Sequence, residues 1–222
     1  MRDLLVLRHG QTPWNLAGRW QGWLDIELDD IGVEQARRRG RQLAADGVRV
    51  TGVVSSPLAR ALATARIVAA ALGHDDIRTY PGLRERNGGA WQGLTRDEID
   101  AQWPGALDAL RRDQVEAPPG GETVHEMMAR LDEALARIDD DMPDGAVLVV
   151  THGGIARALA ARAGAADRGV LKNVGGMWIE YDRGRTRAGV ALPALADDPA
   201  RPEGTLPVAP EVTVTDAEPE PH

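Results

Sequence analysis

The chain has 222 residues, 43% of them hydrophobic, and a formal net charge of −8 at pH 7, which are ordinary values for a single globular domain. The negative charge argues against a nucleic-acid-binding protein, because such a protein would carry a basic face. The chain contains no cysteine, which excludes disulfides, thiolate metal ligands and cysteine nucleophiles.

The first apolar run covers residues 4–7 and is followed directly by Arg8. This run is too short for the core of a signal peptide or for a membrane span. We therefore expect a cytoplasmic protein with no membrane partner.

Short apolar runs rich in valine and leucine then alternate with longer segments of helical periodicity. This alternation predicts an α/β fold of three layers, in which helices cover both faces of a mostly parallel central sheet. The expected strands are residues 4–7, 52–55, 77–80, 147–151 and 177–181. The expected helices are residues 31–45, 58–72, 95–102, 124–140 and 155–163.

Two segments depart from this rhythm, one inside an expected domain of residues 1–191 and one after it. Residues 88–121 are rich in Gly, Pro and Trp and are expected to cover a site rather than join the sheet. Residues 192–222 contain seven acidic residues against Arg201, a net −6 of the total −8. Because this stretch is rich in Pro and Ala and has no hydrophobic period, it predicts an acidic disordered tail.

The candidate functional residues begin directly after the first expected strand, with Arg8, His9 and Gly10. In an open α/β sheet, ligands bind at the carboxyl ends of the strands. Gly10 permits a close backbone approach, Thr12 offers a hydroxyl donor and Asn15 an amide donor. This loop can therefore surround an anion with hydrogen-bond donors.

Two more strand ends repeat this arrangement. Residues 55–60 lead from a strand into a helix that carries Arg60, and residues 151–154 lead from another strand through His152 and Gly153 into a helix. The amides at a helix N-terminus favour negative charge. Two arginines and two histidines would thus converge at one edge of the sheet, which suits a dianionic phosphate because guanidinium offers fixed bidentate donors.

Five motifs in this order, LRHGQTPWN, SSPLARALATA, LRERNGGAWQGLT, GGET and VVTHGGIARAL, give the chain a family resemblance over about residues 4–179. It resembles the histidine phosphatase superfamily, which includes the cofactor-dependent phosphoglycerate mutases. The resemblance implies a phosphoglycerate mutase-like fold, with His9 as the phosphoryl acceptor and Glu85 as the proton donor. It also implies that three residues hold the phosphate: Arg8, Arg60 and His152.

The remaining expected substrate contacts are Gly10, Thr12, Asn15, Gln21, Arg86 and Gly153. The resemblance implies a small phosphomonoester as the partner and no metal or other cofactor, and it leaves a homodimer open. Physical chemistry agrees with the role of His9, since the charges of Arg8 and Arg60 should lower its pKa and keep the ring neutral and nucleophilic.

Three functions remain to be separated. Mutases of this family follow the acid with a histidine and a tyrosine that grip phosphoglycerate, whereas Arg86-Asn87-Gly88-Gly89 follows Glu85 here, although Arg111-Arg112 is similar to part of the mutase insertion. A non-catalytic phospholigand-binding module would have lost the nucleophile or the acid, and this chain keeps both. The favoured reading is therefore metal-independent hydrolysis through a phosphohistidine.

Within the phosphatases, the stretches LRERNGGAWQGLT, APPGGET and GGM resemble actinobacterial glucosyl-3-phosphoglycerate phosphatases. The resemblance points to a sugar phosphate or a phosphoglycerate derivative as the substrate.

Overall fold

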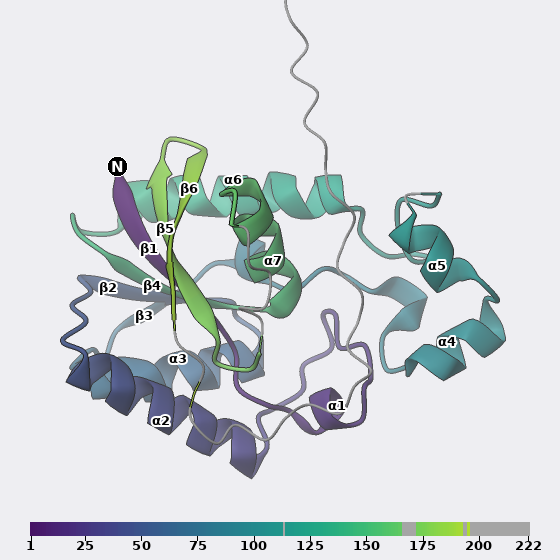
Figure 1. Cartoon of the computed structure of the whole chain (residues 1–222), viewed down its shortest axis with the longest axis horizontal. Helices are drawn as coiled ribbons and strands as arrows, with labels where there is room; N and C mark the ends of the chain where they lie inside the picture. Colours follow the sequence, from purple (N-terminus) through teal and green to yellow (C-terminus); the bar gives the residue numbers. More distant parts are fainter. Residues whose placement is uncertain (113, 166–171, 193–194, 196–222) are drawn as a thin grey trace, which may run out of the picture.

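The computed structural model describes residues 1–112, 114–165, 172–192 and 195. A six-stranded sheet with the strand order β3-β2-β4-β1-β5-β6 forms the centre of the molecule (Figure 1). The strands are β1 (Arg2–Arg8), β2 (Gly52–Ser55), β3 (Ile77–Thr79), β4 (Val147–Thr151), β5 (Gly176–Asp182) and β6 (Arg185–Ala191). The helices are α1 (Pro13–Leu16), α2 (Asp30–Ala45), α3 (Ala59–Ala71), α4 (Arg96–Gln102), α5 (Ala106–Arg111), α6 (Val124–Asp141) and α7 (Gly153–Arg162), with 3-10 turns at Pro81–Leu83 (η1) and Gly89–Trp91 (η2).

The sheet is mostly parallel, which confirms the predicted fold class. Strands β3, β2, β4 and β1 run parallel to one another, β5 pairs antiparallel with β1, and β6 pairs antiparallel with β5 at the edge. Strand β6 is not among the strands expected from the sequence; it is an edge strand whose residues are exposed or half-buried and whose first three residues are polar.

Alternate residues of the central strands pack into two separate apolar clusters. In β1, Leu4 and Val6 join the cluster built by α6 and α7, whereas Leu5 and Leu7 join the cluster built by α2 and α3. Both faces of the strand are therefore covered by helices, which explains why the strand is apolar at consecutive positions. Figure 1 shows the resulting three layers.

The segment of residues 88–121 has a small apolar cluster of its own. Trp91, Ile99 and Leu107 are buried there, and Trp20 and Trp103 pack against them. Figure 1 shows α4 and α5 to one side of the sheet rather than on either of its faces. That this segment covers the site stays a prediction.

Two leucines that follow β6, Leu192 and Leu195, still pack against the domain. The Leu192 N–H donates to the carbonyl of Gly176 at 2.8 Å, and the side chains of Leu192 and Leu195 pack against the α2/α3 cluster. The rest of the predicted tail, residues 193–194 and 196–222, lies outside the described residues. None of the helices in the described part of the chain has both the length and the apolar character needed to cross a bilayer.

Candidate active site

Three parallel strands bring distant parts of the sequence together at one edge of the sheet. Strands β2, β4 and β1 are neighbours, so their carboxyl ends lie side by side. Beyond the strands, the His9 N–H donates to the carbonyl of Thr151 at 3.0 Å and the Ser56 N–H to the carbonyl of Val150 at 2.9 Å. As a result, the ring centroids of His9 and His152 lie 5.2 Å apart.

The His9 ring is buried and held in one tautomer. It is 3% exposed, and its Nδ1 lies 2.7 Å from the carbonyl oxygen of Gly10. Because a carbonyl only accepts, Nδ1 carries the proton and Nε2 keeps its lone pair. Burial lowers the pKa of His9 well below its ordinary value, and the charges of Arg60 and Arg8 lower it further. The ring is therefore neutral at neutral pH and has a free nucleophilic nitrogen.

Two buried arginines flank the histidines. Arg60, in the first turn of α3, is fully buried and donates to the carbonyls of Gly22 and Leu24, each at 2.8 Å. Its Nε has no hydrogen-bond partner among the described residues. Burial lowers the pKa of Arg60 to about 10, so the group remains a cation at neutral pH. Arg8 is the last residue of β1 and is 7% exposed.

His152 offers a hydrogen-bond donor beside His9. Its Nε2 lies 2.8 Å from the Ser56 hydroxyl, which also accepts from the Leu58 N–H at 3.3 Å. The hydroxyl proton is thus available to Nε2, and the ring proton then belongs on Nδ1. Burial lowers the pKa of His152 well below its ordinary value. Within the described part of the chain, the buried Nδ1 has no partner, so it can donate to a ligand.

The loop after β1 is fixed by a close backbone contact and a capping box. A Cβ at Gly10 would lie 2.5 Å from the carbonyl oxygen of Gly32, so only glycine fits here. Thr12 caps α1, and its hydroxyl accepts from the Asn15 N–H at 3.1 Å. The Oδ1 of Asn15 accepts from Asn173 at 3.2 Å, which leaves the amide group of Asn15 as the donor end of this side chain.

The carboxylate of Glu85 is held at the N-terminus of α7, next to His152. Its Oε2 accepts from the Gly154 N–H at 2.9 Å and its Oε1 from the Arg86 N–H at 2.8 Å. A Cβ at Gly154 would lie 2.2 Å from Oε1, so this glycine makes room for the carboxylate. The charge of Glu85 also raises the pKa of Arg60 against the effect of burial, which shows that the two groups interact.

Of the other three expected contacts, Gly153 is the first residue of α7, and Gln21 and Arg86 differ in their surroundings. Gln21 is buried, and its Oε1 has no donor among the described residues. Arg86, in contrast, has its guanidinium engaged by the carbonyls of Glu122 at 2.6 Å and Glu116 at 2.7 Å. Gln21 thus lies one residue before Gly22, whose carbonyl accepts from Arg60, whereas the donors of Arg86 are used by the chain itself.

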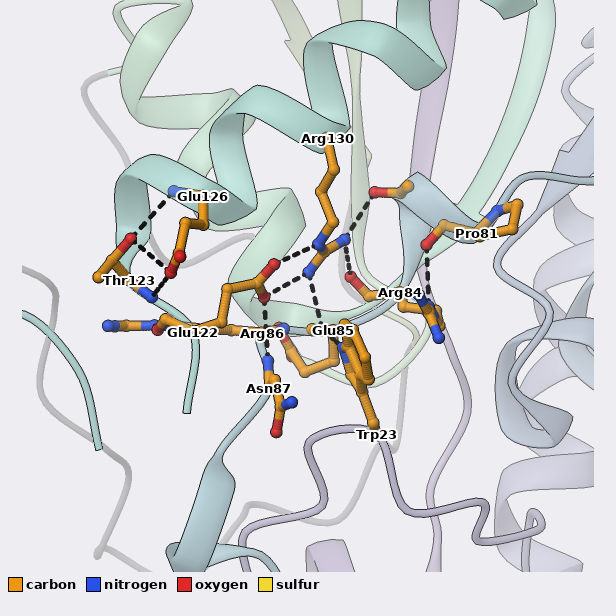
Figure 2. Close-up of polar contacts among 11 residues, drawn as sticks. Trp23, Pro81, Arg84, Glu85, Arg86, Asn87, Glu122, Thr123, Glu126 and Arg130 are labelled. Carbon is orange, nitrogen blue, oxygen red and sulfur yellow. Dashed lines mark hydrogen bonds and ion pairs between the residues drawn. The ribbon is translucent and has the colours of Figure 1, made fainter. Parts of the chain in front are cut away.

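Sequence reasoning missed the residues that surround the backbone of Glu85 (Figure 2). Arg130 of α6 donates to the carbonyls of Gly82, Arg84 and Glu85 and is paired with Glu122. The Trp23 Nε1–H also donates to the Glu85 carbonyl, at 2.6 Å. Glu122 belongs to the GGET motif, which could have marked it as a candidate functional residue. No sequence pattern links it to Arg130.

Metal binding has no candidate site in the described ranges. Among residues 1–112, 114–165, 172–192 and 195, no three His, Asp or Glu side chains are grouped as a metal ion would require.

Comparisons with known proteins show which family the chain resembles. The family model of the histidine phosphatase superfamily (branch 1) matches residues 4–189. Glucosyl-3-phosphoglycerate phosphatase of Mycobacterium tuberculosis is 40% identical over 168 residues, which cover 72% of this chain and 74% of that protein. A 2,3-bisphosphoglycerate-dependent phosphoglycerate mutase of Methylobacterium is 39% identical over 168 residues, covering 72% and 79%.

A solved structure of a mycobacterial glucosyl-3-phosphoglycerate phosphatase in complex with VO3 is also similar. Its TM-score is 0.73 at 36% sequence identity, over 86% of this chain and 98% of that one.

Proposed function

The chain belongs to the histidine phosphatase superfamily and is a phosphatase, and we propose that it hydrolyses a small phosphomonoester without a metal through a phosphohistidine at His9. The observation that carries the mechanism is the state of the His9 ring. The ring is buried and neutral, its Nδ1 proton is bound to Gly10, and its Nε2 is free to attack.

In the first step, Nε2 of His9 forms a bond to phosphorus while the bond from phosphorus to the leaving oxygen breaks. The electron pair of that bond goes to the leaving oxygen, which takes a proton from the carboxyl group of Glu85. Arg8, Arg60 and the Nδ1–H of His152 stabilise the equatorial oxygens of the transferring group.

In the second step, water removes the phosphoryl group. The Glu85 carboxylate takes a proton from water as the oxygen of that water bonds to phosphorus, and the P–N bond breaks. Its electron pair returns to Nε2, so His9 is regenerated and inorganic phosphate leaves.

For the substrate, we propose a sugar phosphate or a phosphoglycerate derivative. The support is the 40% sequence identity to one glucosyl-3-phosphoglycerate phosphatase and the structural similarity to another solved one, with a TM-score of 0.73 at 36% sequence identity. A panel of phosphomonoesters, including glucosyl-3-phosphoglycerate and phosphoserine, ranks the candidates by kcat/KM.

The covalent step is tested by trapping the intermediate. Quenching without acid during turnover of a ³²P-labelled substrate should yield a labelled protein that is stable to alkali and labile to acid. The label should be absent from His9→Ala. Full turnover by His9→Ala would overturn the covalent mechanism.

The reaction products distinguish hydrolysis from phosphoryl transfer to a second position of the substrate. With 3-phosphoglycerate and a bisphosphoglycerate primer, we expect release of inorganic phosphate and little 2-phosphoglycerate. Rapid formation of 2-phosphoglycerate with little free phosphate would assign the chain to the mutases instead. Binding of phosphate without release of any product would indicate a non-catalytic module.

A further inference from the structure

The backbone of the loop that carries Glu85 is held by the ion pair of Arg130 and Glu122 (Figure 2). Arg130 donates to three carbonyls of this loop, those of Gly82 at 2.7 Å, Arg84 at 2.8 Å and Glu85 at 2.9 Å. The arginine comes from α6, a separate element of the fold. One guanidinium therefore fixes the backbone that leads to the proposed proton donor.

Glu122 completes this arrangement from the other side. Its carboxylate accepts from Nε of Arg130 at 2.6 Å and from Nη2 at 2.8 Å, in the bidentate geometry that only arginine offers. The same carboxylate accepts from the Asn87 N–H at 3.0 Å. The pair thus holds the chain both before and after Glu85.

The pair is well shielded from solvent, with side-chain exposures of 16% for Arg130 and 11% for Glu122. Loss of either partner leaves the other charge buried and alone, which is costly. The arrangement therefore has one low-energy geometry and fixes the loop in a single position. General acid catalysis depends on such placement, because a shift of about 1 Å at a reacting group can cost roughly a hundredfold in rate.

We propose that Arg130 and Glu122 are positioning residues for proton donation, which hold Glu85 at the leaving oxygen without touching the substrate. This inference rests on the proposed function, in which Glu85 is the proton donor. Its specific consequence is a dependence on the leaving group. An alkyl alkoxide needs a proton as it departs, whereas p-nitrophenolate hardly does.

The test is a single-turnover measurement of the phosphorylation step with an alkyl phosphate and with p-nitrophenyl phosphate. Arg130→Lys keeps the charge but loses the planar fork. We expect it to slow phosphorylation from the alkyl phosphate by about 10- to 100-fold and from p-nitrophenyl phosphate by less than about threefold. Glu122→Gln should show the same asymmetry, and it carries the test if Arg130→Lys does not fold.

The chain provides a matched control at the opposite end of α6. Arg2 is also buried, is paired with Asp139 at 2.9 Å and donates to the carbonyls of Asp139, Met142 and Pro143. It lies at the start of β1, roughly 20 Å along the strand from Arg8. Arg2→Lys and Asp139→Asn should lower the thermal midpoint while leaving both phosphorylation rates unchanged.

A double variant separates the failure of this inference from the failure of the proposed function. In the Glu85→Gln background, Arg130→Lys should cost little further rate, since there is no proton donor left to position. If Glu85→Gln itself shows no dependence on the leaving group, the assignment of the proton donor is wrong. If Glu85→Gln shows it, but Arg130→Lys and Glu122→Gln slow both substrates equally or neither, the positioning role is overturned.

Discussion

Two buried histidines in contact at the end of the sheet make the stability of the folded protein depend on pH. Burial is the largest cause of the lowered pKa of both His9 and His152, and the nearby arginines add to it. The unfolded chain has these groups near their ordinary pKa of about 6.5. Below that pH the unfolded state therefore binds more protons than the folded state, and the free energy of unfolding falls as the pH falls.

We predict that this loss amounts to about 1.4 kcal/mol per pH unit for each histidine, between pH 6.5 and the lower pKa of the folded state. Urea denaturation of the wild type and of His152→Asn between pH 5 and pH 7 measures it. His152→Asn should have the shallower slope, and His125→Gln, which changes an exposed residue of α6, should keep the slope of the wild type. Equal slopes for the wild type and His152→Asn would contradict the prediction.

A second prediction at the residue scale concerns Gly154. A Cβ at this position would lie 2.2 Å from the Glu85 carboxylate, so Gly154→Ala must displace the proposed proton donor. Alanine is favoured over glycine within a helix by about 0.5–1 kcal/mol, so the fold should be retained. We expect phosphorylation from an alkyl phosphate to fall about a hundredfold with no fall in the thermal midpoint. An unchanged rate would show that the carboxylate moves aside without consequence for the chemistry.

At the scale of elements, the sequence predicts those strands, helices and site residues that a local pattern of apolar residues marks. The strands at residues 4–7 and 147–151 are recognisable because helices cover both of their faces and they are apolar throughout. His9, Arg60 and His152 are recognisable because each follows such a strand. The contacts of Arg130 with residues 82–85 are different, since they depend on how α6 packs against η1, which no local pattern encodes.

The C-terminal element yields a prediction about where the fold ends. Leu192 and Leu195 are half-buried against the α2/α3 cluster, and together they should contribute about 2 kcal/mol. We therefore expect a chain that ends at Leu195 to keep the stability and turnover of the full chain, and a chain that ends at Ala191 to unfold at a lower temperature. Calorimetry and turnover of the two truncated chains measure this. Lost turnover in the longer one would show that residues 196–222 take part in the function.

At the scale of the whole molecule, the proposed phosphate site can form only when the fold is complete. Its groups come from the ends of β1, β2 and β4 and from the loop before Glu85, so no single part of the chain contains it. A ligand that binds this site therefore stabilises the entire fold by mass action, by about 2.7 kcal/mol at a concentration one hundred times its Kd. For a chain of this length, 1 kcal/mol raises the thermal midpoint by about 2–4 °C.

Inorganic phosphate at that concentration should thus raise the thermal midpoint of the full chain by about 5–11 °C. Arg60→Met should lose most of this shift, because Arg60 is the fully buried cation beside both histidines, and the comparison uses the shift of each protein relative to its own midpoint without phosphate. A chelator should leave the shift and the turnover unchanged, since the proposed chemistry uses no metal. A shift that disappears with the chelator and returns with magnesium or zinc would mean that a metal holds the phosphate, and the roles of Arg8, Arg60 and His152 would have to be assigned again.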